Sequence, residues 1–273
     1  MKTIFLLSLG ILFFTLPGCN NFKSTHPQAH IADEKGDTGI TDKFILNFSG
    51  TIDRELRFFK KEYSVIYKSG DLSLYAEKYS AHRDGILYKT YTSNGNISST
   101  VKSYYLKNDS LILVTESTKW LNEQGEVFKD VRTYLRNNII FKIDSRTASS
   151  AEALRTLPYL LVPAVENKYP DENYTDDLKA VKDAVLGQDK FEMVFDHIAT
   201  YPDAIYITLK SKLKNNYKAN ILVSQRDPFI DSLLNTPAVF KDEKLKLNWK
   251  IEDQETVYVP VAKTTTSAKG LNK

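Results

Sequence analysis

The chain has 273 residues, of which 37 are basic and 34 acidic, and a formal net charge of +3. A protein that binds nucleic acid is expected to carry a clustered basic face, so we expect no nucleic-acid partner. The length allows one or two domains with real hydrophobic cores. Because the chain has a single cysteine, a disulfide framework within it is excluded.

Residues 1–18 have the features of a secretory signal peptide. Lys2 is the only charge before an apolar run, Ile4–Phe14, which is shorter than the ~20 residues that a transmembrane helix needs. The next segment, 16–19 (LPGC), resembles the lipobox of bacterial lipoproteins, in which the peptide is cut before the cysteine and the thiol carries a diacylglycerol. The resemblance implies lipidation of Cys19. The alternative is an ordinary secretory peptide with a stray cysteine near its cleavage site.

Lipid on Cys19 would hold the protein to a membrane of the bacterial cell envelope, because two or more acyl chains give lasting anchorage. The body of the protein would then lie in the periplasm. Residues 19–41 are polar and have no apolar period, which predicts a flexible tether. His26 and His30 within this tether have the spacing of a metal pair, but a metal site needs more ligands and a fixed frame.

Region 42–149 is predicted to be an antiparallel β-meander domain. Lys43–Ser49 is predicted to be a strand, whereas Thr51–Glu62 fits either a short helix or a strand. Alternating apolar residues between turns rich in Asn, Asp and Gly then predict tightly connected antiparallel strands. These strands are Leu72–Tyr79, Gly85–Thr92, Ser98–Leu106, Ser110–Glu116, Val127–Leu135 and Ile139–Asp144.

Two segments of this region echo each other, Ser103–Val114 (SYYLKNDSLILV) and Arg132–Ile143 (RTYLRNNIIFKI). Each combines Tyr-Leu, a basic residue and Asn with a following apolar strand, which is typical of a strand–turn–strand unit. Such Tyr-rich hairpins resemble the β-meander domains of many bacterial envelope lipoproteins. The resemblance covers this region only and implies no activity.

Residues 150–187 are predicted to be a helical connector. Ser149 and Ser150 are suitable N-caps for a first short helix. The clearest helix of the chain is predicted over Thr175–Leu186, with Thr175 as N-cap and Gly187 at the stop. The acidic residues around its start are more typical of a solvated helix end than of a Ca²⁺ site.

Residues 188–263 are predicted to form an OB-like five-stranded barrel, and residues 264–273 a disordered tail. Asp227 is the predicted cap of a short helix with Pro228 at its first position. Three strands, this helix and two further strands follow one another in the order of an OB fold, although a small open sheet has the same order. The strands are Lys190–Ala199, Ala204–Lys210, Tyr217–Ser224, Lys244–Glu252 and Glu255–Ala262. The expected fold class is therefore mainly β (α+β).

Alternation along the fourth of these strands assigns its two faces. Trp249 falls in register with the apolar positions and is predicted to face the core. The opposite positions form a polar stripe, Lys246, Asn248 and Lys250, which we single out as a possible binding face. Such a stripe is more often simply solvated.

No catalytic motif is found in the sequence. The familiar nucleophile, zinc and phosphate-binding patterns are missing, so we expect no cofactor and no metal site, and we lean against an enzyme. His82 stands beside a turn. Asp196 and His197 are neighbours on a predicted strand, where side chains point to opposite faces, so they are not predicted to act together. A carboxylate pair distant in sequence stays open.

These features together favour a lipid-anchored binding or assembly protein of the cell envelope, with a protein or glycan partner. Two alternatives remain. One is an enzyme acting on envelope glycan or peptide, and the other is an immunity or inhibitor lipoprotein.

Overall fold

The computed structural model describes residues 40–81, 84–165 and 173–260. All described elements belong to one compact unit of the chain. The signal-peptide and lipidation predictions, Cys19 included, lie outside the described residues, as do His82, the tether and the C-terminal tail.

The first described element is a helix where the sequence analysis predicted a strand. Helix α2 spans Asp42–Glu55, and its N-cap Thr41 accepts a hydrogen bond from the backbone N–H of Phe44. Its buried residues are Ile45, Ser49 and Ile52, at the spacing of one helix face. The strand prediction over Lys43–Ser49 was therefore wrong. The apolar residues of this segment also fit a strand, and the helical spacing becomes evident only when Ile52 is included.

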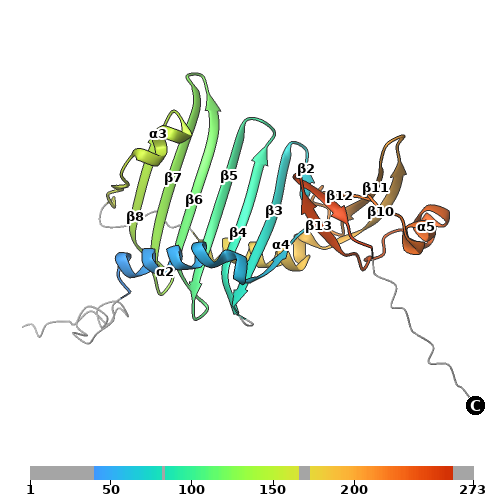
Figure 1. Ribbon diagram of the computed structural model, residues 1–273, viewed down its shortest axis with the longest axis horizontal. Coiled ribbons are helices and arrows are strands. Elements are labelled where there is room, and N and C mark those ends of the chain that lie inside the picture. The colour runs from blue at the N-terminus through green and yellow to red at the C-terminus, as the bar shows by residue number, and fades with distance from the viewer. Residues whose placement is uncertain (1–39, 82–83, 166–172, 261–273) are drawn as a thin grey trace, which may run out of the picture. The chain divides into compact units, whose positions relative to one another are not determined.

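Six long strands form the predicted meander, and each is antiparallel to the next (Figure 1). The turn residues Asn108, Asp109, Asn137 and Asn138 have positive φ, as their residue types predict. The strands are β3 (Leu72–Ala81), β4 (Asp84–Asn94), β5 (Ser98–Lys107), β6 (Ser110–Asn122), β7 (Gly125–Arg136) and β8 (Ile139–Ala148).

A buried tyrosine recurs beside three of the meander's hairpins. In each case the strand register shifts directly after the tyrosine, and the ring packs in the apolar cluster under α2. Each hydroxyl group donates to a carboxylate at 2.8–3.1 Å: Tyr79 to Glu77, Tyr105 to Asp53 and Tyr134 to Asp144. The sequence echo thus corresponds to a repeated bulge that directs a tyrosine toward α2.

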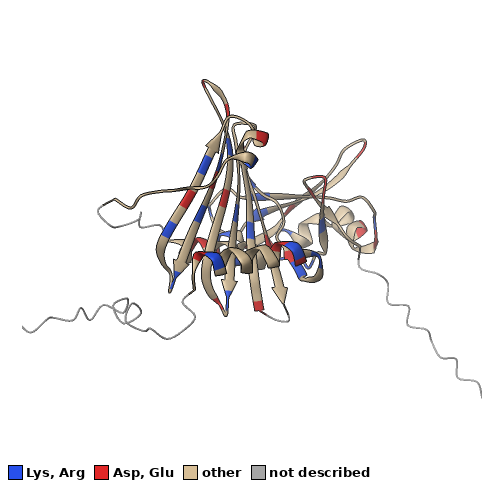
Figure 2. Ribbon diagram, turned by 60° about the vertical axis from the view of Figure 1, so that its left-hand side comes forward, with Lys and Arg blue, Asp and Glu red and all other residues tan. Residues whose placement is uncertain are grey.

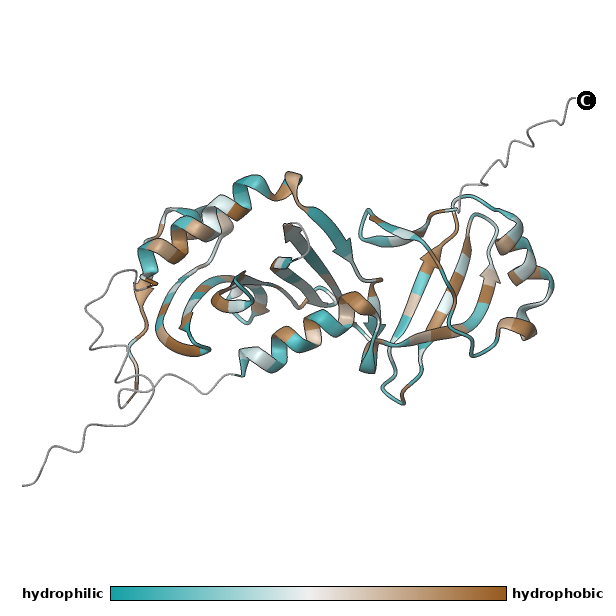
Figure 3. Ribbon diagram, turned by 90° about the horizontal axis from the view of Figure 1, so that it is seen from below, coloured by the Kyte–Doolittle hydropathy of each residue, from teal (hydrophilic) through white to brown (hydrophobic). Residues whose placement is uncertain are grey.

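Helices cover both faces of the meander (Figure 3). On one face, α2 packs on Leu87, Leu113 and their neighbours. On the other, α4 (Tyr174–Leu186) packs on side chains such as Tyr88, one residue further along β4. The N-cap of α4 is Asn173 rather than the predicted Thr175, and Gly187 ends the helix at φ +60° as expected.

Short elements connect these parts and extend the sheet. The bend between β1 and β2 lets both strands pair with β3, and Ser150 caps α3 as predicted. Strand β9 has only two residues, lies between Pro158 and Pro163, and pairs with β8. The bounds are η1 (Leu56–Phe58), β1 (Lys60–Tyr63), β2 (Tyr67–Ser69), α3 (Ala151–Thr156), β9 (Leu160–Leu161) and η2 (Asp189–Phe191).

The C-terminal module contains the five predicted strands, with helices between the third and the fourth. They pair in the order β10-β11-β12-β14-β13, and β12 and β14 are parallel. Two backbone hydrogen bonds join Phe195 of β10 to residues 242 and 243, in the segment that leads into β13. The first strand of the module thus lies beside the segment before its fourth strand, which gives an OB-like, partly open arrangement. The bounds are β10 (Met193–Thr200), β11 (Ile205–Ser211), β12 (Lys218–Leu222), α5 (Pro228–Asn235), α6 (Pro237–Phe240), β13 (Trp249–Glu252) and β14 (Glu255–Tyr258).

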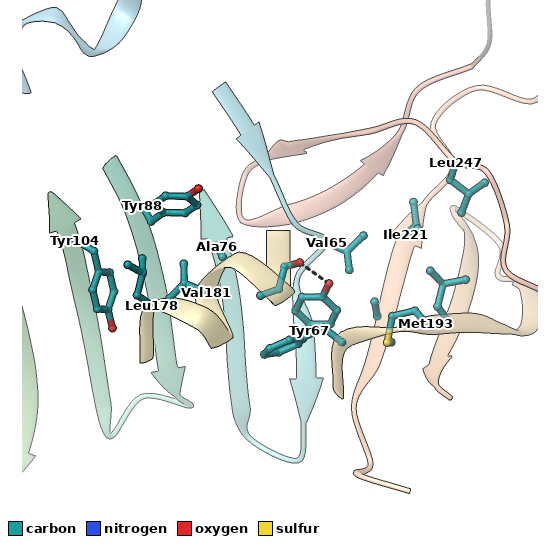
Figure 4. Close-up of a cluster of buried hydrophobic side chains, with 14 of the residues drawn as sticks. Val65, Tyr67, Ala76, Tyr88, Tyr104, Leu178, Val181, Met193, Ile221 and Leu247 are labelled. Carbon is teal, nitrogen blue, oxygen red and sulfur yellow. Dashed lines mark hydrogen bonds between the residues drawn. The ribbon is translucent and has the colours of Figure 1, made fainter. Parts of the chain in front are cut away.

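The meander and the module share one sheet of 14 strands. The link is β12, whose first residue, Lys218, pairs with Lys68 of β2, while Ile221 and Leu222 pair with β14. One apolar cluster also runs through both parts, and Tyr67 within it donates a hydrogen bond to the Ala184 carbonyl at 2.9 Å (Figure 4). The separate domains predicted at 42–149 and 188–263 are thus joined by strand pairing and by a common core.

Candidate binding site

The predicted polar stripe lies on the surface, as alternation requires. Lys246, Asn248 and Lys250 are all exposed, and the Lys250 ammonium pairs with Glu252 at 2.7 Å. Of these three residues, only Lys250 lies within β13. This strand is shorter than predicted, because only four of its residues pair with β14. The ring of Trp249 is half-buried and packs against the core, as predicted.

A cleft of about 240 Å³ opens where β2, β12 and β14 meet. We call it the fork cleft. It takes residues from β2 and the bend before it, from three strands of the module (β11, β12 and β14) and from the β13–β14 turn. Its lining residues are Ile66, Lys68, Tyr206, Asn220, Gln254, Glu255 and Thr256.

Strand alternation orients the side chains that line the fork cleft, and one buried hydrogen bond holds its two sides together. Ile207 and Ile221 are fully buried, which turns Tyr206 and Asn220 to the outer face of β11 and β12. The backbone N–H of Ile66 donates to the buried Thr256 hydroxyl at 3.0 Å and holds the two sides of the fork together.

The lining of the fork cleft suits a polar ligand with little net charge. It carries one ammonium, from Lys68, and one carboxylate, from Glu255, beside side-chain amides and hydroxyl groups. Tyr206 presents an aromatic ring supported edge-on by Tyr201, with ring centroids 6.1 Å apart. Amides, hydroxyls and an aromatic ring are the groups that bind uncharged polyhydroxylated molecules through hydrogen bonds and ring contacts.

No local pattern in the sequence indicates the fork cleft. Alternation along Ala204–Lys210 would have placed Tyr206 outward, but nothing local indicates that Lys68 lies beside it. That neighbourhood depends on the pairing of Lys68 with Lys218, 150 positions later in the chain and therefore invisible to a local pattern.

A second polar cluster surrounds Asp196, and here a sequence prediction was wrong. A register shift between Phe195 and His197 makes Asp196 a bulged residue, so its carboxylate reaches the Nδ1 atom of His197 at 2.9 Å. The hydrogen bond from Lys241, at 2.7 Å, and that from His197 hold the pKa of Asp196 well below its ordinary value. One oxygen of this carboxylate binds Lys241 and the other binds His197, so we interpret Asp196 as a structural residue that stabilises the bulge.

Glu77 is a further acidic residue with several partners, and it is buried in the meander. Its carboxylate accepts hydrogen bonds from Tyr79 at 2.8 Å and Tyr91 at 3.0 Å and pairs with Lys61. Tyr75 stacks on Tyr91 with ring centroids 4.4 Å apart, and burial with the nearby Glu77 charge raises the pKa of Tyr75 to about 12. These three partners occupy both oxygens of the Glu77 carboxylate.

A groove of about 360 Å³ lies between α4 and the meander. Its polar lining is threonine-rich and includes Lys102, placed between Glu116 at 3.1 Å and Asp177 at 3.7 Å. Figure 2 likewise shows acidic and basic residues interspersed on the strands of the meander. Charges of both signs thus neutralise each other along this face.

Within the described ranges, no group of three His, Cys, Asp or Glu residues is placed to hold a metal ion. In the same ranges, no helix combines the length and the apolar character that a membrane crossing requires. No family model, curated protein or solved structure matches this chain.

Proposed function

We propose that this chain is a non-catalytic, lipid-anchored binding protein of the bacterial cell envelope. The lipid would be attached at Cys19, and the body would lie in the periplasm. The fork cleft would bind a polar segment of an envelope component, and a glycan is the ligand class that its chemistry favours. The exposed stripe of Lys246, Asn248 and Lys250 would be a second contact for the same partner.

The fork cleft is the observation that carries this proposal. It is preformed, it combines one charge of each sign with amides, hydroxyls and a tyrosine ring, and it lies on the strand pair that OB-like modules use for ligands. Binding by such a surface requires hydrogen-bond donors and acceptors but no reactive group.

Binding is favoured over chemistry by the state of the acidic groups. A glycosidase needs two carboxyl groups flanking one bond, with one of them able to give up a proton. Asp196 is held ionised by Lys241 and His197, and Glu77 is enclosed by tyrosines and Lys61. Neither carboxylate is arranged to donate a proton to a ligand.

Affinity capture tests the proposal. Residues 20–273, which retain every described residue, would be immobilised and exposed to detergent-solubilised envelope, and bound proteins and glycans would be identified by mass spectrometry. We expect Tyr206→Ala and Asn220→Ala to reduce glycan retention roughly tenfold or more, because each removes contacts that lie within the cleft. Thr147→Ala, an exposed change on β8, is the matched control and should retain the wild-type amount.

The result also separates the alternatives. Retained glycan of unchanged length supports binding, whereas shortened fragments would replace the proposal with an enzyme. A single retained hydrolase that loses activity on binding would favour the immunity reading. The anchor is tested apart from the ligand, because Cys19→Ala should remove the diacylglycerol mass and release the protein from membranes.

A further inference from the structure

Three lysines form a row across the point where the meander joins the module. Strands β2 and β12 pair through Lys68 and Lys218, and Lys218 also lies opposite Lys210 of β11 (Figure 1). Residues directly opposite each other in an antiparallel ladder project to the same face of the sheet. Because the chain neighbours Tyr67 and Ala219 are buried, the lysines of this row project outward.

One lysine of the row is neutralised by carboxylates and the other two are not. The Lys210 ammonium lies 2.8 Å from the Asp242 carboxylate and 3.5 Å from that of Asp196. Within the described ranges, neither Lys68 nor Lys218 forms an ion pair, and both are exposed. We call these two residues the lysine pair. Like charges directly opposite each other destabilise a ladder, so a bound anion would relieve a repulsion at the join.

The lysine pair is continuous with the fork cleft. Lys68 lines the cleft, and Lys218 lies on the same face of β12 as Asn220, which also lines it. The carboxylate of the cleft, from Glu255, belongs to β14, the other partner of β12. Basic and acidic groups therefore lie on opposite arms of the fork. With Lys218 included, two ammonium groups face one carboxylate, which suits a ligand that carries an anionic group at one end.

A hydroxyl group stands beside the lysine pair. Ser73 of β3 lies directly opposite Lys68, and its hydroxyl shares a hydrogen bond of 2.7 Å with that of Ser93. Two hydroxyl groups have two protons, and their mutual bond uses one of them, so one O–H is left to donate. Adjacent positions on β12, β2 and β3 thus present two ammonium groups and a hydroxyl on one face.

We propose that the lysine pair binds a phosphate group carried by the sugar ligand of the fork cleft. This inference rests on the proposed function and narrows its ligand class to glycans that bear phosphate. A phosphate has three terminal oxygens for the two ammonium groups and the hydroxyl, and lysine binds phosphate as a point charge without the planar fork that matches a carboxylate. The sugar ring would contact Tyr206 and direct its hydroxyl groups toward Glu255.

A titration of residues 20–273, followed through the backbone amide NMR signals of Lys68, Lys218 and Asn220, tests the inference. Glucose 6-phosphate should bind with a Kd on the order of 1 mM. Glucose lacks the charge, and inorganic phosphate lacks the ring, so each should bind at least tenfold more weakly. Glucuronate has a carboxylate in place of the phosphate and should bind at least threefold more weakly, because it offers one oxygen fewer.

Variants assign the effect to the lysine pair. Lys68→Gln and Lys218→Gln should each weaken glucose 6-phosphate binding roughly three- to tenfold, and Lys218→Gln should leave the affinity for glucose unchanged. Lys218→Glu replaces a repulsion by an ion pair with Lys68, so it should abolish phosphate binding while raising the urea midpoint. Lys129→Gln is the matched control, because Lys129 is an exposed lysine of β7 that forms no ion pair with a described residue. It should leave the affinity unchanged.

Several results would overturn the phosphate inference. Glucose binding as tightly as glucose 6-phosphate would leave the fork cleft as a site for neutral glycans, and tighter binding of glucuronate would assign the lysine pair to a carboxylate. Inorganic phosphate binding as tightly would show a free anion site without a sugar. Equal losses in Lys218→Gln and Lys129→Gln would reduce the effect to net charge. No shift with glucose 6-phosphate at its solubility limit would also overturn it, whereas the fork cleft is tested separately by envelope capture with Tyr206→Ala.

Discussion

The meander and the C-terminal module are built from the same kind of strand but differ in how the strands are ordered. In the meander, consecutive strands of 10–13 residues pair in chain order, and helices cover both faces. In the module, strands of 4–8 residues pair out of order, and β12 divides its edge between β2 and β14. The fork cleft lies at that division.

This difference explains where binding surfaces arise. In a sheet whose neighbouring strands are also consecutive in the chain, tight turns join the strands, and each strand pairs with its chain neighbours along its length. Where one strand has two partners along the same edge, the partners must diverge, and the gap is lined by side chains from distant parts of the chain. On the proposed function, the meander would serve as the scaffold and the module would carry the binding site.

The largest expected effect tests whether scaffold and module fold together. Leu135→Ala in the meander and Ile221→Ala in the module each remove a side chain that is 1% exposed or less, and each should cost about 2–5 kcal/mol of unfolding free energy. Because one apolar cluster spans both parts, both variants should lower the midpoint of a single transition in urea.

Two transitions, with each variant moving only one of them, would show instead that the parts unfold separately. The exposed change Thr147→Ala is the control and should move the midpoint by less than about 0.5 kcal/mol.

A smaller effect is expected at the junction itself. Thr256→Val keeps the size of the side chain but leaves the buried N–H of Ile66 without an acceptor, which should cost about 1–3 kcal/mol. Thr256→Ser keeps the hydroxyl and should cost less. If Thr256→Val lost no more stability than Thr256→Ser in urea denaturation, the hydrogen bond to Ile66 would not be the dominant contribution of Thr256.

A pH-dependent effect is expected at the bulge of β10. Because Lys241 and then His197 lower the folded-state pKa of Asp196, its contribution to stability is present above the unfolded pKa of about 3.9 and is lost as the pH falls through the lower folded value. Asp196→Asn should therefore cost about 1 kcal/mol at pH 7, discounted because Lys241 is half exposed.

The gap between the wild type and Asp196→Asn should narrow as the pH falls below about 4, in thermal melts at low salt. A gap that is constant from neutral to acidic pH would show that the carboxylate is not stabilised by its partners.

The smallest expected effect concerns the polar stripe. Lys246→Ala, Asn248→Ala and Lys250→Ala lie on the surface, and together they should change the unfolding free energy by less than about 0.5 kcal/mol. Loss of partner retention in this triple variant would then reflect a lost contact, and unchanged retention would restrict the binding surface to the fork cleft.

The sequence predicted the meander and the order of elements in the module well, because alternation and turn residues such as Asn137 and Asn138 act locally. It failed at α2, where apolar residues fit a strand until Ile52 completes a helical face. It also missed the Asp196 bulge, which depends on pairing with β11. The fork cleft depends on contacts between residues far apart in the chain, so no local pattern predicts it.

Hydrogen exchange of the chain with its captured partner tests the central claim most directly, namely that the module and not the meander carries the binding site. Amide protection measured by mass spectrometry should increase in β11, in β12 and in the β13–β14 turn, while β3–β8 exchange as in the free protein. Protection confined to α4 and the strands beneath it, with the module unchanged, would contradict the account and assign binding to the groove around Lys102.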